Sequence, residues 1–364
     1  SEYTTGEHST SFFVMSCDPL FASKRRCSLV PKALILLPLW LLLAACESTL
    51  ERTVFDGQTM GTTYRITLST EEPISAVASA RLASEFDNKL IYINSLMSTY
   101  DPLSEVSRFN KGKAGQCHAV SEETRAVIDQ SKMLYVKTNG AFDPTVGPLV
   151  NLWGFGPERQ ISNPPDPELV VMARQQTGFD AIELGCEAGG VLKAMPREID
   201  LSAIAKGFAV DYLSDWLIEG GYSNHLVEIG GEIKAAGRAP SGEAWRVAIE
   251  RPSQLQRQLY KVVQLTNASM ATSGDYRNFF VANGKRYSHT IDPRTGYPVT
   301  HQVASVTVIH PVAAMADGWA TALNVMGRES GMALAENEGL AVLMLEYEED
   351  ALIPHASEAF RALF

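Results

Sequence analysis

The stretch that decides how this chain folds reads Val312-Ala-Ala-Met-Ala-Asp-Gly-Trp-Ala-Thr-Ala-Leu-Asn-Val-Met326. Its small apolar residues have helical spacing, and Pro311 suits the first turn, so we predict a helix here. Asp317 and Thr321 are four residues apart, which places their oxygens on one face of that helix. These oxygens are costly to bury without a partner, and Mg²⁺ suits them well. The alternative is a capping or turn Asp and a Thr bonded to its own helix backbone.

Hydrophobic spacing and turn residues predict the elements on either side of this helix. Further helices are predicted at 74–97, 121–138, 167–177, 202–220 and 328–337. Strands are predicted at 53–70 with a turn at Gly57, and at 198–201, 226–236, 245–250, 261–266, 279–281, 286–291, 303–309 and 340–345. Within this series, Asn283-Gly284 is a strong hairpin signal. The alternation predicts an α/β (α+β) protein with mixed sheets, much antiparallel pairing and packed helices.

The composition bounds the class of protein. The 364 residues are 45% hydrophobic and 20% charged, which is ordinary for a globular chain of one large or two small domains. A formal net charge of −11 argues against a general nucleic-acid surface. The five cysteines, at 17, 27, 46, 117 and 186, include no CxxC pair and no zinc-ligand spacing. The common GxGxxG, GxxxxGK(S/T), GxSxG and HExxH motifs are also missing from the sequence.

The N-terminal region has the pattern of a targeting segment. Lys24-Arg-Arg26 and Lys32 precede a mostly apolar run at 33–45, which has the length of a signal-peptide core and is short for a membrane span. The run ends in Leu43-Ala-Ala-Cys46, which resembles the bacterial lipobox, where the Cys is lipidated and becomes the mature N-terminus. The alternative is an ordinary signal peptide that ends beside a chance Cys. Met15 is a candidate start residue.

These features predict the organisation of the chain and its compartment. We divide it into a signal peptide with lipobox (1–45), a lipidated tether (46–52) and a folded domain (53–364). The domain is then expected in the bacterial periplasm, anchored to a membrane by lipid at Cys46. The inner membrane is expected, with the outer membrane as the alternative. A disulfide between Cys117 and Cys186 is permitted in that compartment, although sequence alone does not give their separation.

A polar cluster at the predicted 198–201 strand and 202–220 helix suits an anionic ligand. Asp200 ends the strand, Ser202 is expected to cap the helix, and Lys206 lies one turn further on. Free N–H groups and the helix dipole attract phosphates at such a position. The alternative is a surface charge arrangement with a capping Ser.

Other segments combine polar residues with turns. Gly230-Gly231 allows a close backbone approach to a ligand, or simply makes a tight hairpin. Ala141-Phe-Asp-Pro144 places an aromatic ring and a carboxylate in what is by default a plain turn. The polar segment Ser273-Gly-Asp-Tyr-Arg-Asn278 leads towards Ser288-His-Thr-Ile-Asp-Pro293. Its His289 is either a structural group or a general base beside a substrate.

Taken together, these segments resemble the ApbE family, the FAD:protein FMN transferases. The matching segments, in the family's order, are 60–62, 97–101, 141–144, 199–207, 229–232, 271–278, 288–293 and 316–322. Each motif is weak alone, but eight in order are specific, and they extend over nearly all of the chain after Cys46. The resemblance implies an ApbE-like, T-fold-related architecture.

The resemblance also implies roles for individual residues. Mg²⁺ is expected on the Asp317 and Thr321 side chains and the Ala203 backbone carbonyl, and His289 and Asp317 are the expected catalytic residues. The residues expected to contact the substrate FAD are Met60, Tyr100, Ala141, Phe142, Asp143, Asp200, Lys206 and Ile291. Two positions differ from residues found in other members of the family. Ala203 replaces Thr or Ser, which a carbonyl contact tolerates, and Lys206 replaces Glu in some relatives, which changes the local charge.

The implied reaction moves the FMN phosphoryl group of FAD to a Thr hydroxyl of a target protein, and AMP leaves. Such transfer depends mostly on positioning and charge neutralisation. The implied acceptors are subunits of Na⁺-translocating NADH:quinone reductase or RNF-type complexes. The alternatives are a Mg²⁺-dependent FAD pyrophosphatase, a non-catalytic FAD-binding lipoprotein, and a lipid-anchored scaffold. Mn²⁺ accepts the same oxygen ligands as Mg²⁺.

Overall fold

The computed structural model describes residues 50–156, 161, 163–252, 258–274, 279–349 and 351–364. The predicted signal peptide, the predicted lipidation site Cys46, and residues 275–278 of the polar Ser273 segment lie outside the described residues. The first strand, β1 (Glu51–Thr59), begins two residues before the predicted domain start at 53. Within the described ranges, no helix combines the length and apolarity needed to cross a membrane.

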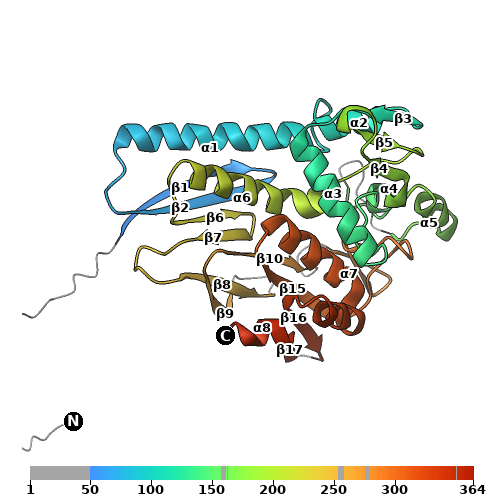
Figure 1. Ribbon diagram of the computed structural model, residues 1–364. Helices are drawn as coiled ribbons and strands as arrows, with labels where there is room; N and C mark the ends of the chain where they lie inside the picture. The colour runs from blue at the N-terminus through green and yellow to red at the C-terminus, as the bar shows by residue number, and fades with distance from the viewer. Residues whose placement is uncertain (1–49, 157–160, 162, 253–257, 275–278, 350) are drawn as a thin grey trace, which may run out of the picture. The chain divides into compact units, whose positions relative to one another are not determined.

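An eight-stranded sheet forms the centre of the fold (Figure 1). Its order is β1-β2-β6-β7-β10-β15-β16-β17, and all neighbours pair antiparallel. The bounds after β1 are β2 (Thr62–Thr70), β6 (His225–Ile229), β7 (Glu232–Ala236), β10 (Ala268–Gly274), β15 (Val303–His310), β16 (Ala341–Glu348) and β17 (Ala351–Ala356). Successive side chains point to opposite faces, so the sheet buries apolar residues on both sides.

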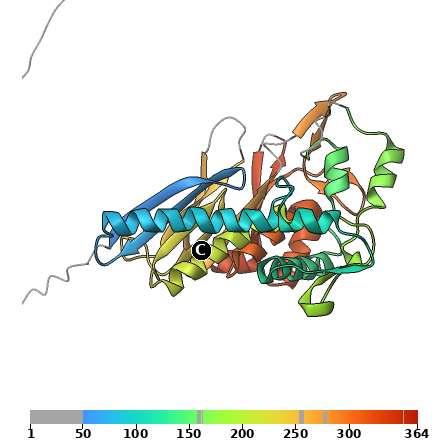
Figure 2. The same cartoon turned by 90° about the horizontal axis from the view of Figure 1, so that it is seen from above.

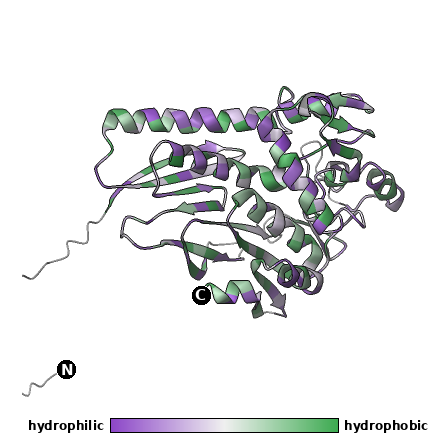
Figure 3. Cartoon of the chain, in the orientation of Figure 1, coloured by the Kyte–Doolittle hydropathy of each residue, from purple (hydrophilic) through white to green (hydrophobic). Residues whose placement is uncertain are grey.

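One face of the sheet packs against three long helices, α1 (Ala76–Met97), α6 (Ser202–Glu219) and α7 (Ala313–Asn337). A fourth helix, α3 (Glu122–Lys137), packs against these three helices and joins the same core. Figures 1 and 2 show α1 running along the same side as α6. The buried Leu82, Phe86, Leu90 and Ile93 recur every three or four residues along α1, which gives the banded colouring of this helix in Figure 3.

The opposite face of the sheet is covered by a hairpin and a short helix. The hairpin consists of β8 (Trp245–Arg251) and β9 (Gln258–Leu265), and the helix is α8 (Glu358–Ala362). Trp245 and Phe360 bury their rings in this second core. The central sheet is therefore a two-sided layer, with the helices on one side and the hairpin on the other.

The remaining elements are shorter. They are α2 (Glu105–Lys111), β3 (Gln116–His118), α4 (Gly147–Leu152), α5 (Pro167–Arg174), β4 (Ile182–Leu184), β5 (Val191–Lys193), β11 (Phe279–Ala282), β12 (Lys285–Ser288), β13 (Ile291–Asp292) and β14 (Tyr297–Pro298), with 3-10 turns at Phe179–Ala181 and Glu187–Gly189. A disulfide joins Cys117 to Cys186, with Cα atoms 5.9 Å apart, beside the small β3-β5-β4 sheet. The pairing that the sequence permitted is therefore present.

The predicted fold class is confirmed, because the chain forms a mixed α/β structure with antiparallel sheets. The predicted helices at 74–97 and 121–138 are α1 and α3, with Ser75 and Ser121 as N-caps. The predicted helices at 312–326 and 328–337 join as α7, with a kink at Gly327, where φ is 74°. Asn283 and Gly284 both have positive φ, as the predicted hairpin turn requires.

Four local predictions were wrong. The strand predicted at 286–291 is interrupted at residues 289 and 290, between β12 and β13. The first turn lies at Met60 and Gly61, which have φ of 48° and 71°, whereas Gly57 pairs with Tyr64 inside β1 and lies under its ring. Residues 198–201 form no strand, because side-chain and loop groups bind their backbone instead. Ser202 is the first helical residue of α6 rather than its N-cap, and its N–H donates to Asp200 Oδ1 at 2.9 Å.

Helices α6 and α7 cross closely, and this crossing positions the residues of the site. A Cβ on Gly207 would lie 2.7 Å from the Ala314 Cα, so only glycine permits this approach. Helix α7 has no capping side chain of its own. Asp211 of α6 takes that role, since its carboxylate accepts the N–H groups of Ala313 at 3.0 Å and Ala314 at 2.9 Å. The start of α7 is therefore fixed to α6 by both packing and hydrogen bonds.

Candidate active site

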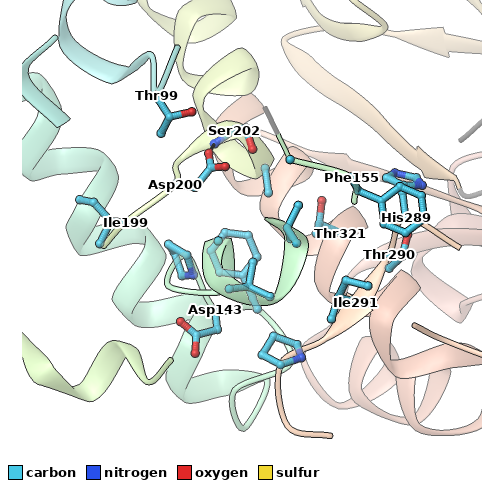
Figure 4. Close-up of a pocket in the computed structure, with 18 of the residues that line it drawn as sticks. Thr99, Asp143, Phe155, Ile199, Asp200, Ser202, His289, Thr290, Ile291 and Thr321 are labelled. Carbon is cyan, nitrogen blue, oxygen red and sulfur yellow. Dashed lines mark hydrogen bonds between the residues drawn. The ribbon is translucent and has the colours of Figure 1, made fainter. Parts of the chain in front are cut away.

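A cavity of about 740 Å³ collects most of the predicted site residues (Figure 4). Those that line it are Tyr100, Ala141, Phe142, Asp143, Asp200, Ala203, Lys206, His289, Ile291, Asp317 and Thr321. Met60 is not among the lining residues; it lies half-buried in the β1–β2 turn and packs against the main core. The cavity has the size and the mixed polar and aromatic walls of a site for a small organic ligand.

A buried charge cluster lies where α6, α7 and β7 meet. The Lys206 Nζ is 2.9 Å from Glu232 Oε1 and 3.6 Å from Asp317 Oδ2. Burial raises the pKa of both the Glu232 and the Asp317 carboxyl. Burial alone lowers the pKa of Lys206, but the attraction of Asp317 and Glu232 outweighs it and raises that pKa above its usual range.

Asp317, Thr321 and Ala203 form a set of oxygen donors that fits a hard cation. The Asp317 carboxylate is 7% exposed, and the Thr321 side chain follows it by one turn on the cavity side of α7. The Gly207 N–H donates to Asp317 Oδ2 at 3.1 Å. In a regular α-helix the Gly207 N–H would donate to the Ala203 carbonyl, four residues earlier. Because it also donates to Asp317, its hydrogen bond to that carbonyl is weakened, which leaves the carbonyl oxygen better able to bind a metal ion. Oxygen donors of these kinds are those that Mg²⁺ and Mn²⁺ accept.

The Asp200 segment is held at the edge of the cavity by hydrogen bonds from other parts of the chain. Asn110 of α2 accepts the Ile199 N–H at 2.8 Å and donates to the Ile199 carbonyl at 2.9 Å. The Asp200 N–H donates to the Pro144 carbonyl at 2.7 Å. These bonds replace the strand partner that the sequence suggested for 198–201. They place Asp200 directly before the N-terminus of α6, where its own carboxylate accepts the N–H of Ser202.

The turn at 141–144 brings Phe142 and Asp143 to the cavity in different ways. Asn139 and Gly140 end α3 with positive φ, as their residue types favour, and the Phe142 ring is buried. Asp143 Oδ1 accepts both the N–H and the hydroxyl of Thr145, at 2.8 and 2.6 Å. Burial raises the pKa of Asp143, and these hydrogen bonds oppose the rise. The Asp143 carboxylate therefore stabilises its own turn, as the plain-turn interpretation predicts.

His289 lies beside a column of aromatic rings. Its ring centroid is 6.3 Å from that of Phe155, and both rings line the cavity (Figure 4). Phe155 then packs on Phe280 and Phe280 stacks on Tyr287, with centroids 5.7 and 5.0 Å apart. Phe280 and Tyr287 lie on the two strands of the Asn283–Gly284 hairpin, which leads into His289, whereas Phe155 follows α4. The imidazole therefore lies at the cavity against aromatic rings, in a position from which a base could act.

Some lining residues were not singled out as site residues by sequence reasoning. Asn110 carries no motif signal, because an Asn at a helix end is ordinary. Phe155 lies in a loop and has no sequence feature that distinguishes it from other aromatic residues in loops. Glu232 lies within the family-like segment Ile229-Gly-Gly-Glu232, but only the structure places its carboxylate against Lys206.

The chain is similar to proteins of known activity. The ApbE family model matches residues 60–344. The FAD:protein FMN transferase of Vibrio cholerae is 44% identical over 329 residues, which span 90% of this chain and 97% of that protein. That of Haemophilus influenzae is 40% identical over 326 residues, spanning 88% and 94%.

Solved structures give the same result. The flavin transferase ApbE from Vibrio cholerae superposes with a TM-score of 0.79 at 42% identity, over 86% of this chain and 100% of that chain. The apo form of the Pseudomonas stutzeri flavinyl transferase ApbE also gives 0.79, at 38% identity, over 86% and 97%. With the family model matching most of its length, the chain belongs to the ApbE family.

Proposed function

We propose that this protein is an FAD:protein FMN transferase. The observation that carries the proposal is the single cavity in which Asp317, Thr321 and Lys206 meet His289 and the N-terminus of α6. This combination provides an oxygen site for a metal, positive groups for phosphates and a base for a hydroxyl. The relatives that bear this enzyme name align over nearly their full length.

The proposed reaction balances in atoms and charge. The bond between the FMN phosphorus and the bridging oxygen of FAD breaks, and a bond from that phosphorus to a Thr oxygen of the acceptor forms. AMP leaves with the bridging oxygen, and His289 takes the proton of the Thr hydroxyl. General base catalysis of this kind is typically worth about 10²–10⁴-fold.

The residues of the cavity have separate tasks in this proposal. Mg²⁺ held by Asp317, Thr321 and the Ala203 carbonyl would supply positive charge to the phosphate oxygens. The Lys206 ammonium binds phosphate from the protein side. The aromatic column under His289 keeps the base in place while the acceptor enters.

The location and the acceptors belong to the same proposal. The lipobox-like Leu43-Ala-Ala-Cys46 supports a lipid-anchored protein in the bacterial periplasm, at the inner membrane. The Cys117–Cys186 disulfide fits an oxidising compartment. We propose flavin-acceptor subunits of Na⁺-translocating NADH:quinone reductase or RNF-type complexes as the targets.

Two parallel incubations test the function. The protein, FAD and Mg²⁺ are mixed with an acceptor subunit and, separately, with the same subunit whose target Thr is replaced by Ala. We expect covalent FMN, seen as a mass gain, on the first acceptor only, together with AMP. Free FMN and AMP without any acceptor modification would instead identify a pyrophosphatase. Bound but unchanged FAD would identify a non-catalytic flavin-binding protein.

A further inference from the structure

Glu232 is brought to the cavity by a tight hairpin. Gly230 and Gly231 have φ of 62° and 107°, which only glycine adopts readily, and they connect β6 to β7 by a two-residue turn. Ile229 pairs with Glu232 directly after this turn. The turn therefore fixes both the register and the side of the sheet on which the carboxylate lies, and Glu232 is only 4% exposed.

The two carboxylate oxygens of Glu232 differ in their contacts. Oε1 contacts the Lys206 ammonium at 2.9 Å, whereas Oε2 is buried and has no hydrogen-bond partner among the described residues. A half-satisfied buried carboxylate is costly. Lys206 already has Asp317 as a partner at 3.6 Å, so a second carboxylate is not needed to neutralise it. Burying the Glu232 carboxylate therefore costs folding free energy, which indicates that the carboxylate has a role in the site.

We propose that Glu232 holds the Lys206 ammonium away from Asp317 and so keeps the Asp317 carboxylate open to a divalent cation. The inference rests on the metal site of the proposed function. An ammonium bound closely to Asp317 would compete with a metal for the same oxygen lone pairs. In the structure the ammonium lies nearer to Glu232 than to Asp317.

The charges of the cluster agree with this role. Two carboxylates and one ammonium carry one net negative charge when all are ionised. A divalent cation on Asp317 changes this to one net positive charge, which suits the phosphates of a nucleotide. Lys206 also lines the cavity, so the same ammonium faces the ligand while Glu232 anchors it.

The experiment is a double-mutant cycle read out by metal binding. Mg²⁺ is titrated calorimetrically into the wild type, Glu232→Gln, Lys206→Met and the double variant, each with saturating AMP. We expect Glu232→Gln to weaken Mg²⁺ binding about tenfold, or about 1.4 kcal/mol. Lys206→Met should restore the affinity in the Glu232→Gln background, because the competing ammonium is gone. Its effect should be much smaller in the wild-type background.

Matched measurements separate the possible failures. Glu228→Gln removes the same charge from the same hairpin without lining the cavity, and should leave Mg²⁺ affinity nearly unchanged. Urea unfolding confirms that each variant is folded. If the wild type binds Mg²⁺ and Glu232→Gln binds it equally well, the role of Glu232 is overturned while the transferase proposal stands. The role of Glu232 is also overturned if the effects of Glu232→Gln and Lys206→Met on the free energy of Mg²⁺ binding simply add in the double variant. A wild type that transfers FMN but binds no Mg²⁺ would overturn the metal site itself.

Discussion

At the scale of single residues, the site depends on Asp317. Asp317→Asn keeps the size of the side chain and an acceptor for the Gly207 N–H, so the fold should survive. It removes the charge that a metal needs, and metal stabilisation of a phosphoryl transition state is worth several kcal/mol. We expect FMN transfer to fall at least about 100-fold. The rate of acceptor modification checks this, and unchanged transfer by a folded variant would contradict the metal assignment.

Gly207 acts through packing rather than charge. In Gly207→Ala, the new methyl group meets the backbone of Ala314 at 2.7 Å, and backbone cannot rotate aside. Helix α7 must then shift, at a cost of about 1–3 kcal/mol. Because Asp317 moves with the helix, FMN transfer should fall as well. Urea unfolding and transfer rates measure the two effects.

The matched control for this substitution lies on the same helix. Gly220 ends α6 with φ of −77°, and a Cβ there lies at an ordinary 3.4 Å from the Trp216 carbonyl oxygen. Gly220→Ala should change the unfolding free energy by less than about 0.5 kcal/mol. Equal effects of the two substitutions would argue against a close crossing of α6 and α7 at Gly207.

Buried His225 gives the stability a pH dependence. It is fully buried, bonded to Ser214 Oγ and the Tyr222 carbonyl, and burial lowers its pKa. Above about pH 6.5 His225 is neutral in both the folded and unfolded states and has no effect. Below that pH only the unfolded state gains the proton readily, so stability falls with decreasing pH. His225→Gln should therefore show a shallower fall between pH 7.5 and 5.5 in urea unfolding, and an unchanged slope would refute this.

At the scale of elements, α2 supports the site from a distance. Asn110 provides both hydrogen bonds of the Ile199 backbone, in place of a neighbouring strand. Asn110→Ala leaves two backbone groups without partners, each costing about 1–3 kcal/mol if they stay buried. The Asp200 segment should loosen, raising KM for FAD more than it lowers kcat. Lys113→Ala, at an exposed position beyond α2, is the control, and equal kinetics of the two variants would exclude this positioning role.

These contacts show which features of the fold can be predicted from the sequence and which cannot. The Asp317 helix and the hairpins at Gly230-Gly231 and Asn283-Gly284 follow from neighbouring residues, so local spacing and turn chemistry predict them. Asn110 meets Ile199 across 89 residues, and Asp211 caps α7 across 102. Such partners are ordinary polar residues whose role exists only after folding. The strand predicted at 198–201 was wrong for this reason. The alternation of buried and more exposed residues was predicted correctly, but the backbone of Ile199 bonds to the Asn110 side chain and not to a neighbouring strand.

At the scale of the whole molecule, the disulfide links stability to compartment. It joins residues 69 apart, and closing a loop of that length restricts the unfolded chain by about 4 kcal/mol in the chain-entropy model. The Cys117→Ala, Cys186→Ala double variant should therefore unfold at lower urea concentration. A reducing agent should have the same effect on the wild type and none on the variant. Identical unfolding of the oxidised and reduced wild type would contradict a stabilising role.

The proposed export can be tested through the same bond. The full chain, produced in a bacterium, should carry a Cys117–Cys186 disulfide and remain with the membrane fraction, because the periplasm oxidises thiols and the lipid retains Cys46. Cys46→Ser should keep the disulfide but lose the lipid and the membrane. A chain that starts at residue 47 stays in the reducing cytoplasm, where both cysteines should react with a thiol-alkylating reagent, measured by mass. A full-length protein with free thiols would refute export, whereas an oxidised Cys46→Ser protein still on the membrane would refute the lipid anchor alone.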